Sequence, residues 1–196
     1  MTSFFEPLPP PPDPAAGRRQ WAPPVWDRPS EGTVPWLVPV NAVVHRGDLA
    51  VVCVESLSVY PNGFVVDLRV LTDPRRSYEE VMAGVRRSGA QVPRVGVRFS
   101  DGRTAGREAT WPHGPARPGL PKEDDGVPTV PVVRFVGGGG GVRAGWRFGV
   151  WVHPLPPKGP VEIFVSLPAA GLEEGRAVVD GKAVRSAAKH ASVVWT

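Results

Sequence analysis

The chain has 196 residues, of which 41% are hydrophobic, with a formal net charge of +4 at pH 7 and an isoelectric point near 9.7. The basic excess is mild, and acidic residues lie between the basic ones along the chain. This pattern argues against a nucleic-acid-binding protein, in which basic residues usually cluster. The single cysteine, Cys53, excludes an intrachain disulfide.

The first 36 residues are expected to form an N-terminal arm, and residues 37–196 a single domain. Eleven of the 25 prolines fall within residues 1–39, and proline disfavours helices and inner strands because it lacks an N–H and fixes φ. We expect the arm to dock on its own domain or on a partner, because it carries aromatic side chains that a plain linker does not need: Phe4, Phe5, Trp21, Trp26 and Trp36.

The arm also satisfies the polyproline pattern over residues 7–12. A polyproline helix is preformed and binds aromatic-lined grooves at low entropic cost. At ~3.1 Å per residue the whole arm reaches roughly 110 Å, which is enough to cross to a neighbouring subunit. The expected partner is therefore a protein or a second copy of this chain.

The remainder of the chain reads as short strands separated by turns. Asn62-Gly63, between two apolar runs, predicts a hairpin with a type I′ turn, since both residues tolerate positive φ. Alternating apolar and polar residues over Phe64–Leu71 predict a half-buried antiparallel strand. Strands are predicted at 37–44, 48–60, 64–71, 94–100, 130–136, 145–153, 161–167 and 192–195.

One amphipathic helix is predicted after the third of these strands. Asp73 suits the N-cap, Pro74 the first helical position and Gly89 the left-handed stop. An apolar stripe at i, i+3, i+4 and i+7 follows: Tyr78, Val81, Met82 and Val85. Many short strands with one helix indicate a mainly β protein, namely an antiparallel immunoglobulin-like β-sandwich, with a barrel as the alternative.

The glycine run at 137–141 loosely matches a dinucleotide-binding fingerprint through Gly139, Gly141 and Ala144. That fingerprint needs a strand before it and a helix after it. A strand is expected at 145–153 instead, so the run is predicted to be a flexible hairpin tip.

Other sequence features give no catalytic, cofactor or metal site. Cys53 lies in an apolar run and is expected to be a buried packing residue. The four histidines lack the spacing of a zinc site, and the acidic stretch 123–125 lacks alternating calcium ligands. We therefore predict no cofactor and no metal.

Four further residues are candidates for interaction: Trp111, His113, Trp151 and Phe164. Trp151 and Phe164 are out of phase with the apolar residues of their own strands. They are expected either to form an exposed apolar patch on neighbouring strands or to be covered by the arm or the helix. The covered arrangement is preferred, because it is the commoner reason for a strand with two apolar faces.

Several segments resemble a family of small actinobacterial proteins with no assigned function. They are WDRPSEG (26–32), YPNGF (60–64), PRVGVRFSDGR (93–103), the glycine run and WRFGVWVHPLPPKGP (146–160). The resemblance implies a bacterial protein that forms one compact unit, and it implies no activity or ligand.

A cytoplasmic location is expected, because the sequence lacks the basic start and apolar run of a secretory signal. Its apolar stretches are also far shorter than the roughly 20 residues that span a membrane. The leading hypothesis is a non-catalytic protein-binding or assembly module. The alternative is a small-ligand binder or an enzyme that uses the proline-rich loop 111–128, and a nucleic-acid binder ranks third.

Overall fold

The computed structural model describes residues 24–77, 79–80, 83, 93–108, 127–141, 145–168 and 171–195. The elements among them follow one another along the chain as β1 (Thr33–Val34), β2 (Trp36–Arg46), β3 (Ala50–Tyr60), β4 (Gly63–Thr72), β5 (Arg94–Arg98), β6 (Thr104–Glu108), β7 (Val132–Gly141), β8 (Gly145–His153), β9 (Pro160–Leu167), β10 (Leu172–Asp180), α2 (Gly181–Ala187) and β11 (Ser192–Val193).

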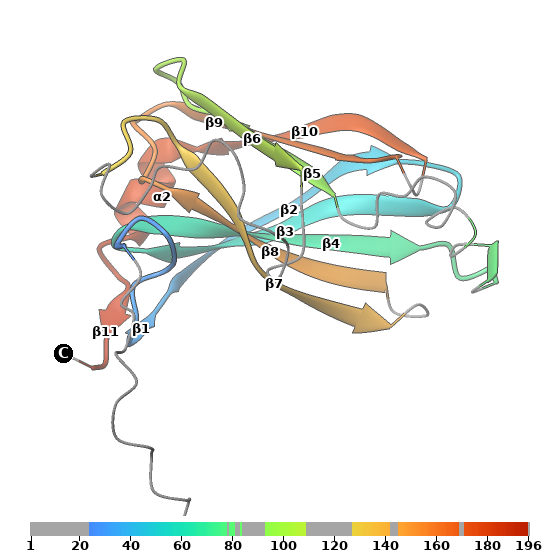
Figure 1. Cartoon of the computed structure of the whole chain (residues 1–196), viewed down its shortest axis with the longest axis horizontal. Helices are drawn as coiled ribbons and strands as arrows, with labels where there is room; N and C mark the ends of the chain where they lie inside the picture. The colour runs from blue at the N-terminus through green and yellow to red at the C-terminus, as the bar shows by residue number, and fades with distance from the viewer. Residues whose placement is uncertain are drawn as a thin grey trace, which may run out of the picture.

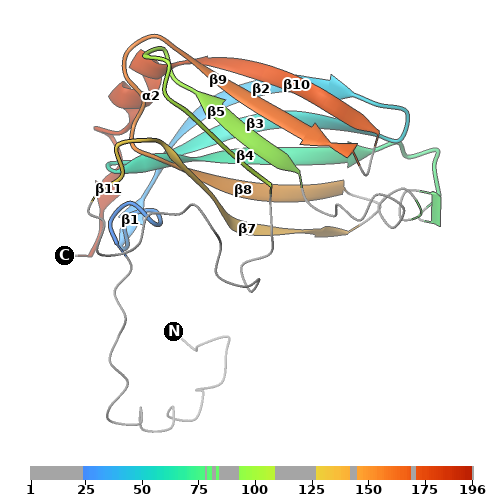
Figure 2. The same ribbon diagram turned by 45° about the horizontal axis from the view of Figure 1, so that its top comes forward.

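Two antiparallel sheets lie face to face (Figures 1 and 2). The five-stranded sheet has the order β2-β3-β4-β8-β7, and the four-stranded sheet has the order β10-β9-β5-β6. β1 and β11 form a separate two-stranded ribbon. The prediction of a mainly β protein with antiparallel sheets is confirmed. The alternative of a barrel is wrong, because the sheets do not close on themselves.

The core lies between the two sheets and follows the alternation in the sequence. In β4, the inward side chains of Phe64, Val66, Leu68 and Val70 are almost wholly buried, whereas Asp67 and Arg69 lie on the outer face. The inward residues of β9 meet them from the other sheet: Val161, Ile163, Val165 and Leu167. Because each strand buries every second residue, the pattern fixes which face of each sheet is inside.

The β3–β4 hairpin is where the sequence places it, but its turn differs from the prediction. Tyr60 pairs with Gly63, so the two loop residues are Pro61 and Asn62. Neither Asn62 nor Gly63 has a positive φ. A type I′ turn is therefore wrong, since the proline ring holds Pro61 at a negative φ.

The glycine run belongs to strand β7 and is not a hairpin tip. Gly137 pairs with Gly149, and the pairing continues to Gly141, which lies opposite Gly145. Pairing with β8 provides hydrogen-bond partners for the backbone groups of the glycines, and this gain outweighs the conformational freedom that glycine loses in a strand. The prediction that a strand follows the run is confirmed, so the context of a dinucleotide-binding loop is absent here.

The helix expected after β4 begins later than predicted. Residues 79, 80 and 83 are helical. Glu80 N–H donates to Ser77 Oγ at 3.2 Å, and Ser77 N–H donates to Glu80 Oε2 at 2.8 Å. This reciprocal pair is a capping box, which makes Ser77 the N-cap in place of Asp73. The apolar stripe predicted for this helix (Tyr78, Val81, Met82 and Val85) lies outside the described residues.

Candidate peptide-docking site

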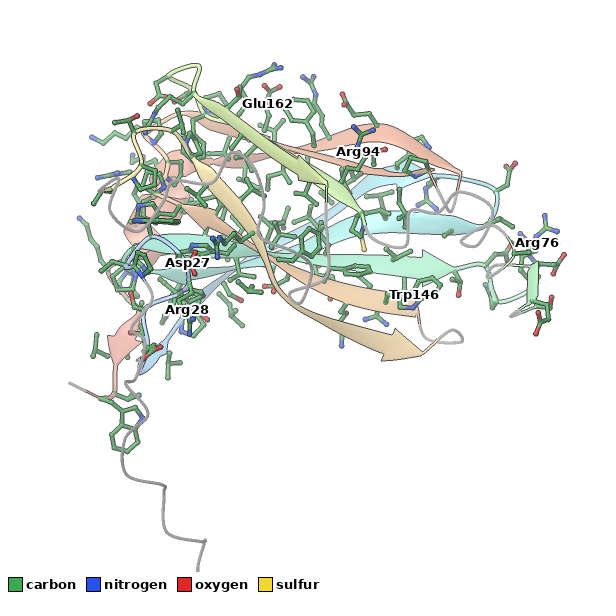
Figure 3. The ribbon with its side chains drawn as sticks, viewed as in Figure 1. Asp27, Arg28, Arg76, Arg94, Trp146 and Glu162 are labelled. Atoms are coloured by element: carbon green, nitrogen blue, oxygen red, sulfur yellow. The ribbon has the colours of Figure 1, made fainter. Side chains whose placement is uncertain are left out.

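Trp151 lies on the outer face of the five-stranded sheet, because its strand β8 points Val150 and Val152 into the core. Nevertheless its side chain has no exposed surface. The cover is the segment 24–31, called here the docked segment, which crosses this face beside β1; Figure 3 shows its residues Asp27 and Arg28 over the sheet. The prediction that the arm covers an out-of-phase aromatic is thus confirmed for Trp151.

Trp26 anchors the docked segment. Its side chain is 4% exposed, and its carbonyl oxygen accepts a buried hydrogen bond of 2.9 Å from Nε1 of Trp151. The rings of Tyr60 and Trp151 form a T-shaped pair, with 6.0 Å between the ring centroids. An indole N–H normally finds a partner when it is buried, and here that partner is a main-chain oxygen of the docked segment.

Asn62, at the tip of the β3–β4 hairpin, holds the main chain of the same segment. Its Nδ2 donates to the carbonyls of Val25 at 2.6 Å and Arg28 at 3.0 Å. Its Oδ1 accepts from Ser30, from the backbone N–H at 3.2 Å and from Oγ at 2.7 Å. One amide side chain therefore satisfies groups at three positions of the docked segment.

A charged pair lies beside Trp26. Asp27 is 7% exposed and forms an ion pair with Arg134 of β7. The Arg134 guanidinium also lies 5.8 Å from the centre of the Trp26 ring, in a cation–π arrangement. Removal of one partner of a buried pair leaves an uncompensated charge, so this contact favours a segment that carries Asp beside Trp.

His153, the last residue of β8, contacts the β3–β4 hairpin. Its side chain is 7% exposed, and its Nδ1 lies 2.6 Å from the carbonyl oxygen of Asn62. That contact requires Nδ1 to donate, which leaves Nε2 as the unprotonated nitrogen, buried and without a hydrogen-bond partner. Burial, which disfavours the charged ring, lowers the pKa of His153 and outweighs the hydrogen bond to Asn62.

The protein should therefore lose stability in weak acid. Because the pKa of His153 is lower in the folded chain, the unfolded chain binds the proton more readily. The free energy of unfolding is expected to be constant between about pH 7 and about pH 8 and to fall once pH drops through the unfolded pKa of about 6.5, by at most about 1.4 kcal/mol per pH unit. The fall should end below the folded pKa.

Urea titrations between pH 8 and 5, a range in which the carboxylates remain ionised, measure this effect. The His153→Phe variant is the control, because it cannot take up the proton. An equal acid slope in the variant and the parent chain would assign the effect to other groups.

A groove of about 700 Å³ runs beside the docked segment on the same sheet face. Its floor includes the paired Gly137 and Gly149, which have no side chains to fill it. One wall contains Tyr60 and Asp67. The remaining lining residues come from the docked segment and the neighbouring strands: Asp27, Arg28, Pro29, Ser58, Val65, Arg134, Phe135 and Val136.

The polar wall of this groove is already hydrogen-bonded. Asp67 Oδ2 accepts from the hydroxyls of Ser56 at 2.9 Å and Ser58 at 2.8 Å. Burial, together with the charge of Asp67, raises the pKa of Tyr60 above its usual value. At neutral pH, Tyr60 therefore acts as a hydrogen-bond donor and not as a base.

The remaining predicted interaction residues do not join this site. Trp36, at the start of β2, is half exposed and lies 5.0 Å from the ring of His190. Phe164 lies on the four-stranded sheet under the guanidinium of Arg98, 5.0 Å from the ring centre. A joint patch of Trp151 and Phe164 is wrong, because their strands belong to different sheets. Five candidates lie outside the described residues: Phe4, Phe5, Trp21, Trp111 and His113.

Cys53 is not the buried packing residue that its apolar run suggests. It lies half-buried on the outer face of β3, where its Sγ is 3.6 Å from the carbonyl of Arg69. Burial and the nearby carboxylate of Glu55 raise the pKa of its thiol. A raised pKa leaves little reactive thiolate at neutral pH.

Sequence reasoning missed four residues of the docking site: Asn62, Arg134, His153 and Gly63, at which a Cβ would meet the Trp151 ring. Asn62 and Gly63 had a sufficient explanation as turn residues. Arg134 and His153 lie in strands, and no motif linked them to Trp26. The one available signal was the phase of Trp151, which marked this sheet face as covered.

Fold and site together define a mainly β protein with two packed antiparallel sheets, which holds a short segment of its own chain against an outer sheet face. Comparisons with protein-family models, curated proteins and solved structures found no match. Within the described ranges, no three His, Cys, Asp or Glu side chains gather as a metal site would require. No described helix has the length and apolar character to cross a membrane.

Proposed function

We propose that this protein is a non-catalytic protein-binding module, and that the sheet face around Trp151 is its peptide-binding site. The observation that carries the proposal is the docked segment itself. It is a short peptide held by one buried aromatic anchor, one charged contact and several hydrogen bonds to its main chain. Recognition domains bind peptides in this way, with main-chain bonds that supply affinity and side-chain pockets that supply specificity.

The contacts also indicate which peptides fit. Trp151 Nε1 and Asn62 Nδ2 donate to main-chain carbonyls, which any sequence offers. The buried Trp26 and its neighbour Asp27, paired with Arg134, discriminate. The partner class is therefore a peptide that carries Trp-Asp in a turn, supplied by another protein or by a second copy of this chain.

Binding in trans tests the proposal. In the full chain, Trp26→Ala with Asp27→Ala should release the docked segment and leave its site empty. A synthetic peptide of residues 24–31 should then bind this variant by calorimetry and raise its free energy of unfolding, by about 2.7 kcal/mol at a hundredfold excess over Kd.

Two comparisons make the test specific. A peptide with alanine at the Trp26 position should bind at least tenfold more weakly, a loss of about 1.4 kcal/mol. Adding Asn62→Ala to the host should weaken binding of the native peptide by a similar factor. If the double variant does not fold, Trp26→Ala alone, which removes the buried anchor, serves as the host. No heat and no stabilisation with a folded host would refute the proposed function.

The groove beside the docked segment supports a second candidate, a small-ligand binder. Its volume suits a small molecule, and its floor can be filled without strain, because a Cβ at Gly137 meets nothing within 4 Å. Gly137→Leu should abolish small-ligand binding and leave peptide binding intact. Unchanged small-ligand binding in this variant would exclude the groove as the ligand site.

Three finer assignments belong to the same proposal. The fold is of the broad immunoglobulin-like sandwich type. Two antiparallel sheets packed face to face support this assignment, and the succession of β2, β3 and β4 in one sheet is a departure from that type. The protein belongs to the small actinobacterial family that it resembles, and it acts in the cytoplasm. Nucleic acid stays the third-ranked partner, since Glu162 pairs with both Arg98 and Arg176 on the outer face of the four-stranded sheet.

A further inference from the structure

The ribbon of β1 and β11 is an exposed apolar element. Thr33 pairs with Val193 and Val34 with Ser192, and the pairing extends through the hydrogen bond of 2.7 Å from Val194 N–H to the carbonyl of Gly32. Six large apolar side chains on the ribbon and the adjoining start of β2 are at least half exposed: Val34, Trp36, Leu37, Val193, Val194 and Trp195. Figure 1 shows the ribbon beside the two sheets, not between them.

Strand alternation places these side chains on both faces of the ribbon. Val34 and Val194 share one face, while Val193 lies with Thr33 on the other. A two-stranded ribbon is at best marginally stable in water by itself. Exposed apolar side chains gathered on one element mark an interaction site, so the ribbon is a candidate for a cover.

The described part of the chain begins at Pro24, close to this ribbon. The carbonyl of Val25 accepts a hydrogen bond from Asn62, and Val59, three residues before Asn62, pairs with Trp36 of the apolar surface. Twenty-three residues precede Pro24. The ten residue steps from Pro14 to Pro24 span about 30 Å when extended, so the segment 4–14 can reach every part of the ribbon.

The chemistry of segment 4–14 matches the surface. It contains Phe4, Phe5, Leu8 and a run of prolines, and its charges are acidic, from Glu6 and Asp13. Proline-rich segments dock on aromatic side chains, and the ribbon offers Trp195 and the Trp36–His190 pair. Exposed basic side chains on α2 and the turn after it complement the acidic charge: Lys182, Arg185 and Lys189.

We propose that residues 4–14 cover the apolar ribbon of β1 and β11 within the same chain. A short flexible tether gives an effective concentration in the millimolar range, which favours the tethered segment over a segment from another copy. The ribbon lies outside the Trp151 site, so this proposal does not rest on the proposed function. The ribbon proposal can therefore be tested even if the chain does not bind peptide at the Trp151 face.

The test compares the full chain with an arm variant that carries Phe4→Ser, Phe5→Ser and Leu8→Ser. These positions precede the described fold, so the variant should keep the circular dichroism spectrum of the parent. Hydrogen exchange followed by mass spectrometry should show amides 192–195 exchanging at least threefold faster in the variant, because their cover is lost. A synthetic peptide of residues 4–14, added in excess, should restore the slow rate.

Surface substitutions identify where the peptide binds. In the arm variant, Trp195→Ala and Lys189→Glu should each weaken binding of the 4–14 peptide severalfold. Val178→Ala, which removes an exposed valine from β10, is the matched control and should not change it. Arg18→Ser with Arg19→Ser in the parent chain controls for substitution in the arm and should leave ribbon exchange slow.

Two results would overturn the proposal. One is equal exchange of residues 192–195 in the parent and the arm variant. The other is protection that grows with protein concentration and accompanies a dimeric mass, which would place the segment on a second copy.

Discussion

Replacing Trp26 with alanine should lower the free energy of unfolding by about 3 kcal/mol or more, the range observed when buried tryptophans are truncated. The side chain is 4% exposed, so its removal leaves a cavity where the docked segment meets the sheet. The substitution also leaves the main-chain carbonyl of residue 26, which accepts a hydrogen bond from Trp151, less firmly held. It removes the indole ring that faces the Arg134 guanidinium. Urea denaturation followed by far-ultraviolet circular dichroism measures the change without depending on tryptophan fluorescence.

The neighbouring residue supplies the matched control. Val25 belongs to the same docked segment, but its side chain is 74% exposed. Val25→Ala should alter stability by less than about 0.5 kcal/mol. Equal, small effects of the two substitutions would mean that the docked segment contributes nothing to the stability of the fold, and the description of Trp26 as an anchor would be wrong.

Gly63→Ala is expected to be about as damaging, for a different reason. A Cβ at Gly63 would lie 2.6 and 2.8 Å from two carbons of the Trp151 ring and would overlap the carbonyl oxygen of Val152. That carbonyl belongs to β8, which pairs with β4 next to this position, so it cannot move without disrupting the ladder. Overpacking of this kind costs about 3 kcal/mol.

Gly139→Ala is the control for this substitution, because it also places alanine in a strand but meets nothing within 4 Å. Its stability should be unchanged or slightly raised, since alanine restricts the unfolded chain. A double variant that adds Trp151→Phe to Gly63→Ala should recover part of the loss. Comparable melting curves for Gly63→Ala and Gly139→Ala would contradict the steric argument.

Alternation of apolar and polar residues was enough to predict most strands and their buried faces, because a half-buried strand exposes every second side chain. The same logic identified Trp151 as an aromatic on the wrong face, and hence a covered sheet. The glycine run was misassigned because glycine has no side chain through which a pattern can show. Its conformation is decided by pairing with β8, a neighbour that composition does not reveal.

The docking site could be predicted only in part, for a similar reason. Trp26 stands out by its type, and tryptophan is seldom placed in a proline-rich segment without a contact. Asn62 does not stand out, because four of its five contacts with the docked segment and His153 involve main-chain atoms. Main-chain groups are the same at every residue, so no spacing of residue types predicts such bonds.

The hydrogen bond from Trp151 to Trp26 joins residues 125 positions apart in the chain. During synthesis, residues 24–31 leave the ribosome early, but the face that binds them is incomplete until β8 has emerged. A segment that emerges early is therefore among the last to reach its place. Throughout that interval the side chain of Trp26 has no sheet face to bury it, so it is open to a chaperone that binds exposed aromatic segments.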